Sequence, residues 1–154
     1  MKQTIEFYQE SIQKIRDSLS FEYSVMDELF TFVGTKLNKY YVWAAIAYTK
    51  TGKPFYFYRL CKQRTVDELF ELELDLPKVQ RVYSDDAFAY DTMYAEKSIQ
   101  GKGAMTNKIE NLNSQLRDKI SYLVRKTKAH AKSAEWLDYR LAIFFNAKNL
   151  GLYG

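Results

Sequence analysis

Residues 25–60 of the chain read VMDELFTFVGTKLNKYYVWAAIAYTKTGKPFYFYRL. Aromatic and β-branched residues, which favour strands, fill three runs in this stretch, at 25–34, 40–49 and 54–60. The Thr-Gly pair at 51–52 separates the last two runs and indicates a hairpin turn. The stretch therefore predicts an antiparallel meander of three strands.

Helices and a further strand are expected around this meander. The apolar residues of 2–20 recur at helical spacing. Thr65, with Glu68 three residues later, is typical of an N-cap that opens a helix to about residue 74. The remaining expected elements are a short buried strand at 79–84 and helices at 86–95, 105–123 and 133–148. This order is an α/β pattern with an antiparallel beginning and a parallel continuation.

The bulk composition describes one globular domain of 154 residues. Its single cysteine, Cys61, excludes both an internal disulfide and a cysteine-based zinc cluster within the chain. The longest apolar stretch is far short of a membrane span, and the N-terminus does not resemble a secretory signal. We therefore expect a cytoplasmic, nucleoid-associated protein with no membrane partner.

Positive charge is concentrated in one part of the sequence. Residues 97–140 hold ten Lys or Arg and four Asp or Glu, against a net charge of +4 for the whole chain. Such a concentration indicates a polyanion partner, and a merely solvated helical face is the alternative. The candidate phosphate contacts are Lys102, Lys108, Lys119, Arg125, Lys126, Lys128 and Lys132.

Three carboxylates stand at unusual places in this pattern. Asp27 lies inside the first strand-like run, Asp85 ends the short strand at 79–84, and Glu110 lies early in the helix at 105–123. Carboxylates are poor strand residues and are costly near a core unless something compensates them. Oxygen ligands suit a hard divalent cation, so Mg²⁺ or Mn²⁺ is one such compensation.

The helix at 105–123 has an apolar stripe and a polar flank. Glu110, Asn113 and Arg117 follow one another at spacings of three and four, so they stack on one flank. Arg117 could bind a phosphate with two parallel hydrogen bonds, and Asn113 is a second candidate DNA contact. On helix geometry alone, a surface ladder of salt bridges explains the same pattern. The stripe consists of Ile109, Leu112, Leu116, Ile120 and Leu123.

The segment 106–117, TNKIENLNSQLR, resembles the signature of the insertion-sequence-one family of bacterial transposases, in which Thr is followed by Ile-Glu, Asn and Leu-Arg. Further blocks are similar to the family's Thr-Asp, Arg-Lys and Lys-Ser-x-Glu motifs. They are VYSD at 82–85, RKT at 125–127 and KSAE at 132–135. The resemblance covers roughly residues 25–148.

This resemblance implies a ribonuclease-H-like fold, with a five-stranded mixed sheet flanked by helices. It assigns 1–22 to an N-terminal helix or linker and 23–150 to the catalytic domain. Members of the family open with a zinc-bearing, helix-turn-helix region that this chain lacks, so a separate segment of that kind is a possible partner. Leu137 stands where many members carry a histidine.

The resemblance also implies a DDE transposase, which cleaves DNA and transfers strands with two Mg²⁺ or Mn²⁺ ions. Asp27 would bridge the ions, while Asp85 and Glu110 would each hold one side. Asp85 is preferred to Asp86 because it ends the strand, and Glu28 is left out because it faces the other side of the sheet. Transposon ends and target DNA are the expected partners, and a homodimer or higher assembly is the expected state.

Two other functions stay open at this point. One is a free-standing, metal-dependent nuclease that cuts nucleic acid without joining ends. The other is a non-catalytic or regulatory relative that binds nucleic acid only. Metal-dependent cutting that disappears in Asp85→Asn would separate an enzyme from the last of these.

Overall fold

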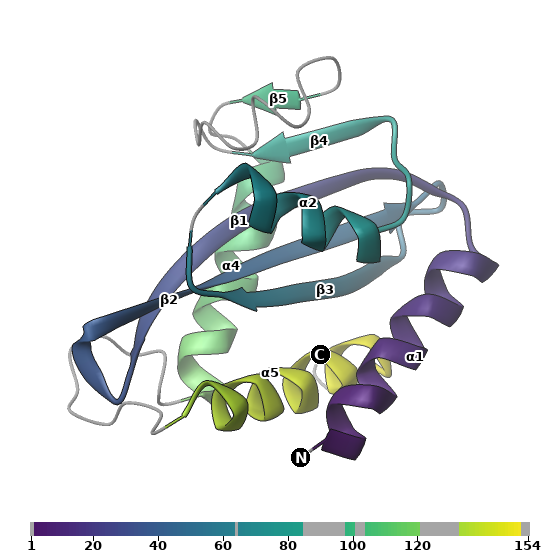
Figure 1. The fold of residues 1–154 in the computed structure, drawn as a ribbon. Coiled ribbons are helices and arrows are strands. Elements are labelled where there is room, and N and C mark those ends of the chain that lie inside the picture. The colour runs from purple at the N-terminus through teal and green to yellow at the C-terminus, as the bar shows by residue number, and fades with distance from the viewer. Residues whose placement is uncertain (1, 64, 85–97, 101–103, 121–132, 152–154) are drawn as a thin grey trace.

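The computed structural model describes residues 2–63, 65–84, 98–100, 104–120 and 133–151 (Figure 1). The elements in chain order are α1 (Lys2–Ser18), β1 (Phe21–Val33), β2 (Thr35–Thr49), β3 (Pro54–Cys61), α2 (Val66–Asp75), β4 (Arg81–Ser84), β5 (Ser98–Gln100), α4 (Ala104–Lys119) and α5 (Ala134–Asn149). The helix expected at 86–95 lies outside the described residues.

One mixed sheet organises these elements, in the strand order β3-β2-β1-β4-β5. The pairs β1–β2 and β2–β3 are antiparallel, whereas β1–β4 and β4–β5 are parallel. The predicted meander and its parallel continuation are therefore confirmed. Four strands form the body of the sheet, and β5 adds three residues at the β4 edge.

The two-stranded ribbon of β1 and β2 is longer than the sequence predicts. We expect an irregular segment at 35–39, but β2 begins at Thr35, directly after Gly34. Gly34 has a φ of 74°, which a residue without Cβ adopts readily, so the chain reverses in a tight turn. Pairing of Phe32 with Lys39 then extends the ribbon beyond the rest of the sheet (Figure 1).

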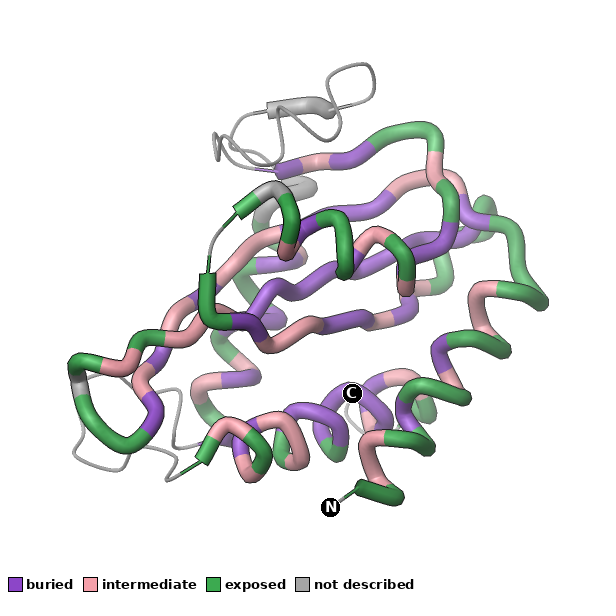
Figure 2. Tube along the Cα trace, viewed as in Figure 1, coloured by how far each residue is buried: buried purple, intermediate pink, exposed green. Residues whose placement is uncertain are grey.

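Helices cover both faces of the sheet. Helix α4 runs behind the sheet in Figure 1 and contacts β1, β2 and β4, while α2 lies in front and contacts β3. Helix α5 packs against β3 and α1. Figure 2 shows buried residues concentrated in the middle of the sheet, with intermediate and exposed residues toward the end of the β1–β2 ribbon. None of the described helices has the length and apolar character needed to cross a membrane.

The outer edge of β3 is covered by side chains of two helices. The hydroxyl of Tyr8 in α1 accepts a hydrogen bond from the Tyr58 backbone N–H at 2.9 Å. The amide of Asn149 bonds to both backbone groups of Tyr56, at 2.7 and 2.9 Å. An edge strand with paired backbone groups cannot accept a further strand at those positions. Because Tyr8 and Ile12 are also buried in the core, α1 packs together with the sheet. The predicted boundary at residue 22, between an N-terminal helix and a catalytic domain, stays a prediction.

Side-chain caps fix the starts of two helices. The Thr65 hydroxyl accepts a hydrogen bond from the backbone N–H of Glu68, three residues later, so the predicted cap of α2 is confirmed. The Ser133 hydroxyl accepts one from the backbone N–H of Trp136 and begins α5. Each cap satisfies a backbone donor that has no partner within its helix.

Candidate site on strand β1 and helix α4

Asp27 lies in the middle of β1, paired with Ala44, on the face of the sheet that α4 covers. Its Oδ1 accepts a hydrogen bond from the Glu28 backbone N–H at 2.8 Å, and its Oδ2 accepts one from Nδ2 of Asn113 at 3.1 Å. These two bonds hold the carboxylate in one orientation.

Asn113 is a buried polar residue of α4, with 5% of its surface exposed. While its Nδ2 donates to Asp27, its Oδ1 is buried and accepts no hydrogen bond from any residue that the structure describes. A buried carbonyl oxygen without a partner is costly. Hard divalent cations favour such oxygen ligands, so the donor set of Asp27 and Asn113 fits a metal of this class.

Sequence reasoning names Asn113 as a DNA contact and misses its contact with Asp27. The position of Asn113 beside the apolar stripe was the available signal, because a polar residue there borders the sheet. The proposed DNA contact through Asn113 stays a prediction.

Glu110 and Arg117 lie on the same polar flank of α4 as Asn113. Glu110 is exposed, one turn before Asn113, and Arg117 is half-exposed, one turn after it. One turn advances about 5.4 Å along the axis, so both side chains start close to Asn113. Lys108 contacts Tyr48 of β2 from the opposite flank, about 200° from Glu110 around the helix. The flank of Glu110 therefore lies on the β4 side.

Strand β4 runs parallel to β1 on that side. The rings of Tyr23 and Tyr83 meet edge to face, with centroids 5.6 Å apart, so the odd-numbered residues of both strands share the α4 face. Ser84 is the last described residue of β4. Asp85 lies outside the described residues, as do the candidate phosphate contacts Lys102, Arg125, Lys126, Lys128 and Lys132.

The structure thus joins Asp27 to Asn113 and places Glu110 on the adjoining flank, but leaves the triad with Asp85 untested. Among the described residues, no three His, Cys, Asp or Glu side chains lie close enough to hold a metal ion. The metal ligands and catalytic roles of the three carboxylates remain predictions.

Lys108 and Lys119 differ in their surroundings. The Nζ of Lys108 donates to the Tyr23 hydroxyl at 3.1 Å and stands 4.3 Å from the ring centroid of Tyr48. The rings of Tyr23 and Tyr48 stack with centroids 4.8 Å apart. Lys119 is exposed at the end of α4. A phosphate contact by Lys108 requires its ammonium to leave these rings.

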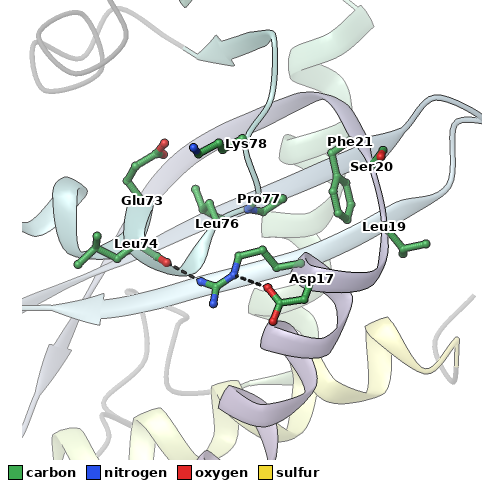
Figure 3. Close-up of a pocket in the computed structure, with 10 residues that line it drawn as sticks. Asp17, Leu19, Ser20, Phe21, Glu73, Leu74, Leu76, Pro77 and Lys78 are labelled. Carbon is green, nitrogen blue, oxygen red and sulfur yellow. Dashed lines mark hydrogen bonds and ion pairs between the residues drawn. The ribbon is translucent and has the colours of Figure 1, made fainter.

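A surface hollow of about 760 Å³ lies away from this site, between the ends of α1 and α2 (Figure 3). Arg16 crosses it, donating to the Leu74 carbonyl at 2.6 Å and pairing with Asp17 at 3.6 Å. None of the candidate carboxylates lines it. The hollow is lined by Arg16, Asp17, Leu19, Ser20, Phe21, Glu73, Leu74, Leu76, Pro77 and Lys78.

Cys61 and Asp138 are among the titratable groups whose pKa is shifted elsewhere in the fold. Burial raises the pKa of the Cys61 thiol to about 12, and the nearby Glu68 adds to the shift. Burial also raises the pKa of Asp138, although the hydrogen bond from the Tyr58 hydroxyl, at 2.6 Å, opposes the shift. A thiol with a raised pKa is a poor nucleophile, so Cys61 is a structural residue at the end of β3, as its sequence position indicates.

Comparison with known proteins gives two matches. The IS1 transposase family matches residues 21–151. The insertion element iso-IS1n protein InsB of Shigella dysenteriae is 34% identical over 112 residues, which cover 71% of this chain and 83% of that protein. The family match spans β1, β4 and α4, the elements that carry or border the candidate site.

Proposed function

Because the chain belongs to the IS1 transposase family, we propose that it cleaves DNA phosphodiesters and transfers strands by DDE chemistry on a ribonuclease-H-like fold. Asp27, Asp85 and Glu110 are the proposed catalytic carboxylates. The contact between Asn113 and Asp27 carries this proposal. It ties the strand carboxylate to the helix that bears Glu110, and it adds a buried oxygen suited to a hard cation.

The pairing of β1 with β4 supports Asp85 as the second carboxylate. Tyr23 pairs with Arg81, and Val25 pairs with Tyr83, 58 positions further along the chain in both cases. Asp27 and Asp85 are separated by the same 58 positions. Neighbouring parallel strands lie about 4.8 Å apart, a distance that suits two carboxylates sharing ions. Asp86 does not share this offset.

Two Mg²⁺ or Mn²⁺ ions, when bound, would activate the attacking hydroxyl and stabilise the leaving oxygen. Asp27, Asp85 and Glu110 would hold these ions. Asn113 would keep the Asp27 carboxylate in its binding orientation. Arg117, one turn from Asn113, would bind a phosphate of the DNA with its guanidinium.

DNA is the partner that a transposase requires, and basic side chains would supply most of the affinity. Phosphate contacts orient DNA without reading its sequence. A homodimer and a separate zinc-bearing, helix-turn-helix segment are further proposals, because joining two ends needs two active sites and a means of finding them. The proposed phosphate contacts are Lys102, Lys108, Lys119, Arg125, Lys126, Lys128 and Lys132.

The test is nicking of a labelled supercoiled plasmid in Mn²⁺ by the wild type and by Asp27→Asn, Asp85→Asn and Glu110→Gln. Each variant should lose at least ~100-fold in rate, because each removes a proposed metal ligand. Glu28→Gln and Asp86→Asn are matched controls, being neighbouring acids outside the proposed triad. Variants that cut like the wild type, or controls that lose as much, would contradict the proposal. Joining of a labelled 3′ end to the plasmid distinguishes transposition from simple nuclease activity.

One observation favours a second candidate, a relative that binds DNA without cutting it. Leu137, at the position where many members carry a histidine, is fully buried in the core. A buried leucine offers the site no proton acceptor. Retention of the labelled plasmid without cutting, in Mg²⁺ and in Mn²⁺, would select this candidate.

A further inference from the structure

The end of the β1–β2 ribbon carries a group of aromatic and basic side chains. We call Phe30, Phe32, Lys39, Tyr40 and Tyr41 the ribbon end. The four aromatic residues are half-buried and Lys39 is exposed, and the ribbon that carries them reaches beyond the rest of the sheet (Figure 1). Tyr40 and Tyr41 pack in part against the core, and the exposed part of each ring adds apolar surface at the end of the ribbon.

Strand pairing puts most of the ribbon end on one face. Phe30 pairs with Tyr41, and Phe32 pairs with Lys39, so these four residues share a side. The Nζ of Lys39 stands 3.9 Å from the ring centroid of Phe30 and 5.2 Å from that of Tyr41. The rings of Phe30 and Phe32 meet edge to face at 5.9 Å. The result is a row of rings with an ammonium among them.

Glu28, two residues before Phe30, is the last acidic residue of the ribbon. Residues 29–66 contain no Asp or Glu. A second copy of the chain on this surface would bring like charges together, which opposes association. Rings within positive charge instead suit a nucleic-acid strand, whose bases stack and whose phosphates are negative. Among the described residues, two basic groups lie at these rings: Lys39 stands beside Phe30 and Tyr41, and the Nζ of Lys62 is 5.9 Å from the ring centroid of Tyr40.

We propose that the ribbon end binds single-stranded DNA. Bases would stack on the rings of Phe32 and Tyr41, and Lys39 would move from the ring of Phe30 to a phosphate. Base faces are hidden in a duplex, so stacking selects an unpaired strand. Phe30 lies three residues from Asp27, about 10 Å along β1, and on the opposite face of the ribbon. The ribbon end is therefore a second contact surface, and it does not depend on the metal chemistry.

The experiment measures fluorescence anisotropy of a labelled 20-nucleotide thymidine strand with the full chain in EDTA, so that no cutting occurs. A strand of equal length without bases provides the same phosphates. We expect the wild type to bind the thymidine strand at least ~5-fold more tightly than the abasic strand, because each stacked base contributes about 1–3 kcal/mol. Phe32→Leu keeps an apolar side chain but removes the ring, and it should bring the two affinities within about twofold.

Phe70→Leu is the matched control, since Phe70 is a 50% exposed phenylalanine of α2. It should leave the ratio of the two affinities unchanged. Lys39→Gln should lower the affinity for the thymidine strand and for the abasic strand by the same factor. The number of counterions released on binding, read from the salt dependence of the affinity, should fall by about one. Thermal melting of each variant checks that the fold is intact.

Three results would overturn the proposal. The first is equal affinity of the wild type for the thymidine and abasic strands. The second is a ratio that persists in both Phe32→Leu and Tyr41→Leu. The third is a concentration-dependent dimer, seen by ultracentrifugation, that Phe32→Leu abolishes while DNA affinity stays constant; that result would assign the surface to a second copy. Loss of nicking by the carboxylate variants is measured separately, so failure of the proposed function and of this proposal remain distinguishable.

Discussion

Asn113 in α4 donates a hydrogen bond to the carboxylate of Asp27 in β1, although 86 positions separate the two residues. The neighbouring Ile109, Leu112 and Leu116 are almost fully buried and fix α4 against the sheet, so the amide has little freedom to turn away. The hydrogen bond from the buried Asn113 amide therefore orients the Asp27 carboxylate before any ligand binds. Hydrogen bonds that orient a metal-ligating side chain commonly affect metal affinity and activity.

Asn113→Ala should therefore reduce nicking more than it reduces stability. Removal of a residue that orients a metal ligand commonly costs about 10–100-fold in activity or metal affinity. We expect a rate loss of that size at low Mn²⁺, with partial recovery at high Mn²⁺, measured as nicked plasmid over a metal titration.

Asn111→Ala is the control for this prediction, because Asn111 is exposed on the same helix. It should cut like the wild type. If Asn113→Ala has the same metal dependence and rate as Asn111→Ala, the hydrogen bond to Asp27 has no part in the reaction.

Local sequence signals predict much of this fold. The Thr-Gly turn at 51–52, the Thr65 cap and the strand runs all act over a few residues, and the structure confirms them. The long ribbon at 35–39 is missed because its polar residues join β2 only through pairing with β1. Local propensity cannot report such pairing.

The candidate site is predictable to a lesser extent. Family resemblance singles out Asp27 and Glu110, but burial of Asn113 against Asp27 depends on how α4 packs across the sheet. Helical periodicity shows which flank is polar and does not show which strand residue that flank meets. Helical periodicity likewise does not predict the hydrogen bond between Tyr8 and the Tyr58 backbone, because these residues are 50 positions apart.

Tyr8→Phe should lower the free energy of unfolding by about 1–3 kcal/mol, the cost of leaving a buried donor unpaired. The substitution removes only the hydroxyl that accepts from the Tyr58 backbone N–H, and the ring that packs against Tyr58 at a tilt stays. Urea unfolding measures the change. Tyr139→Phe, at a half-buried tyrosine of α5, serves as control and should change stability by less than about 0.5 kcal/mol. Equal effects would mean that α1 unfolds separately from β3.

Cys61 should resist alkylation in the folded protein. Burial raises the pKa of its thiol to about 12, so the reactive thiolate is scarce at pH 8. We expect iodoacetamide to modify native Cys61 at least ~100-fold more slowly than the same chain in urea, as followed by mass spectrometry. Equal rates in both conditions would show that the end of β3 opens faster than the reagent reacts.

Asp138→Asn should remove part of the pH dependence of stability. Burial raises the pKa of Asp138 in the folded chain, so the folded state holds its proton more tightly than the unfolded state. The stabilising contribution is complete below the ordinary carboxyl pKa of about 4 and is lost as pH rises through the raised value. Wild-type stability should therefore decline across this window, and the variant should decline less.

The Asp138→Asn substitution keeps a side-chain oxygen that can accept from the Tyr58 hydroxyl, so the hydrogen bond seen at 2.6 Å retains an acceptor. Some decline remains in the variant because burial also raises the pKa of Asp75. Urea unfolding between pH 4 and pH 8 gives the two curves, and Asp118→Asn removes an exposed carboxylate as control. If Asp138→Asn and the wild type lose stability in parallel over this range, burial of Asp138 does not set the pH response of the fold.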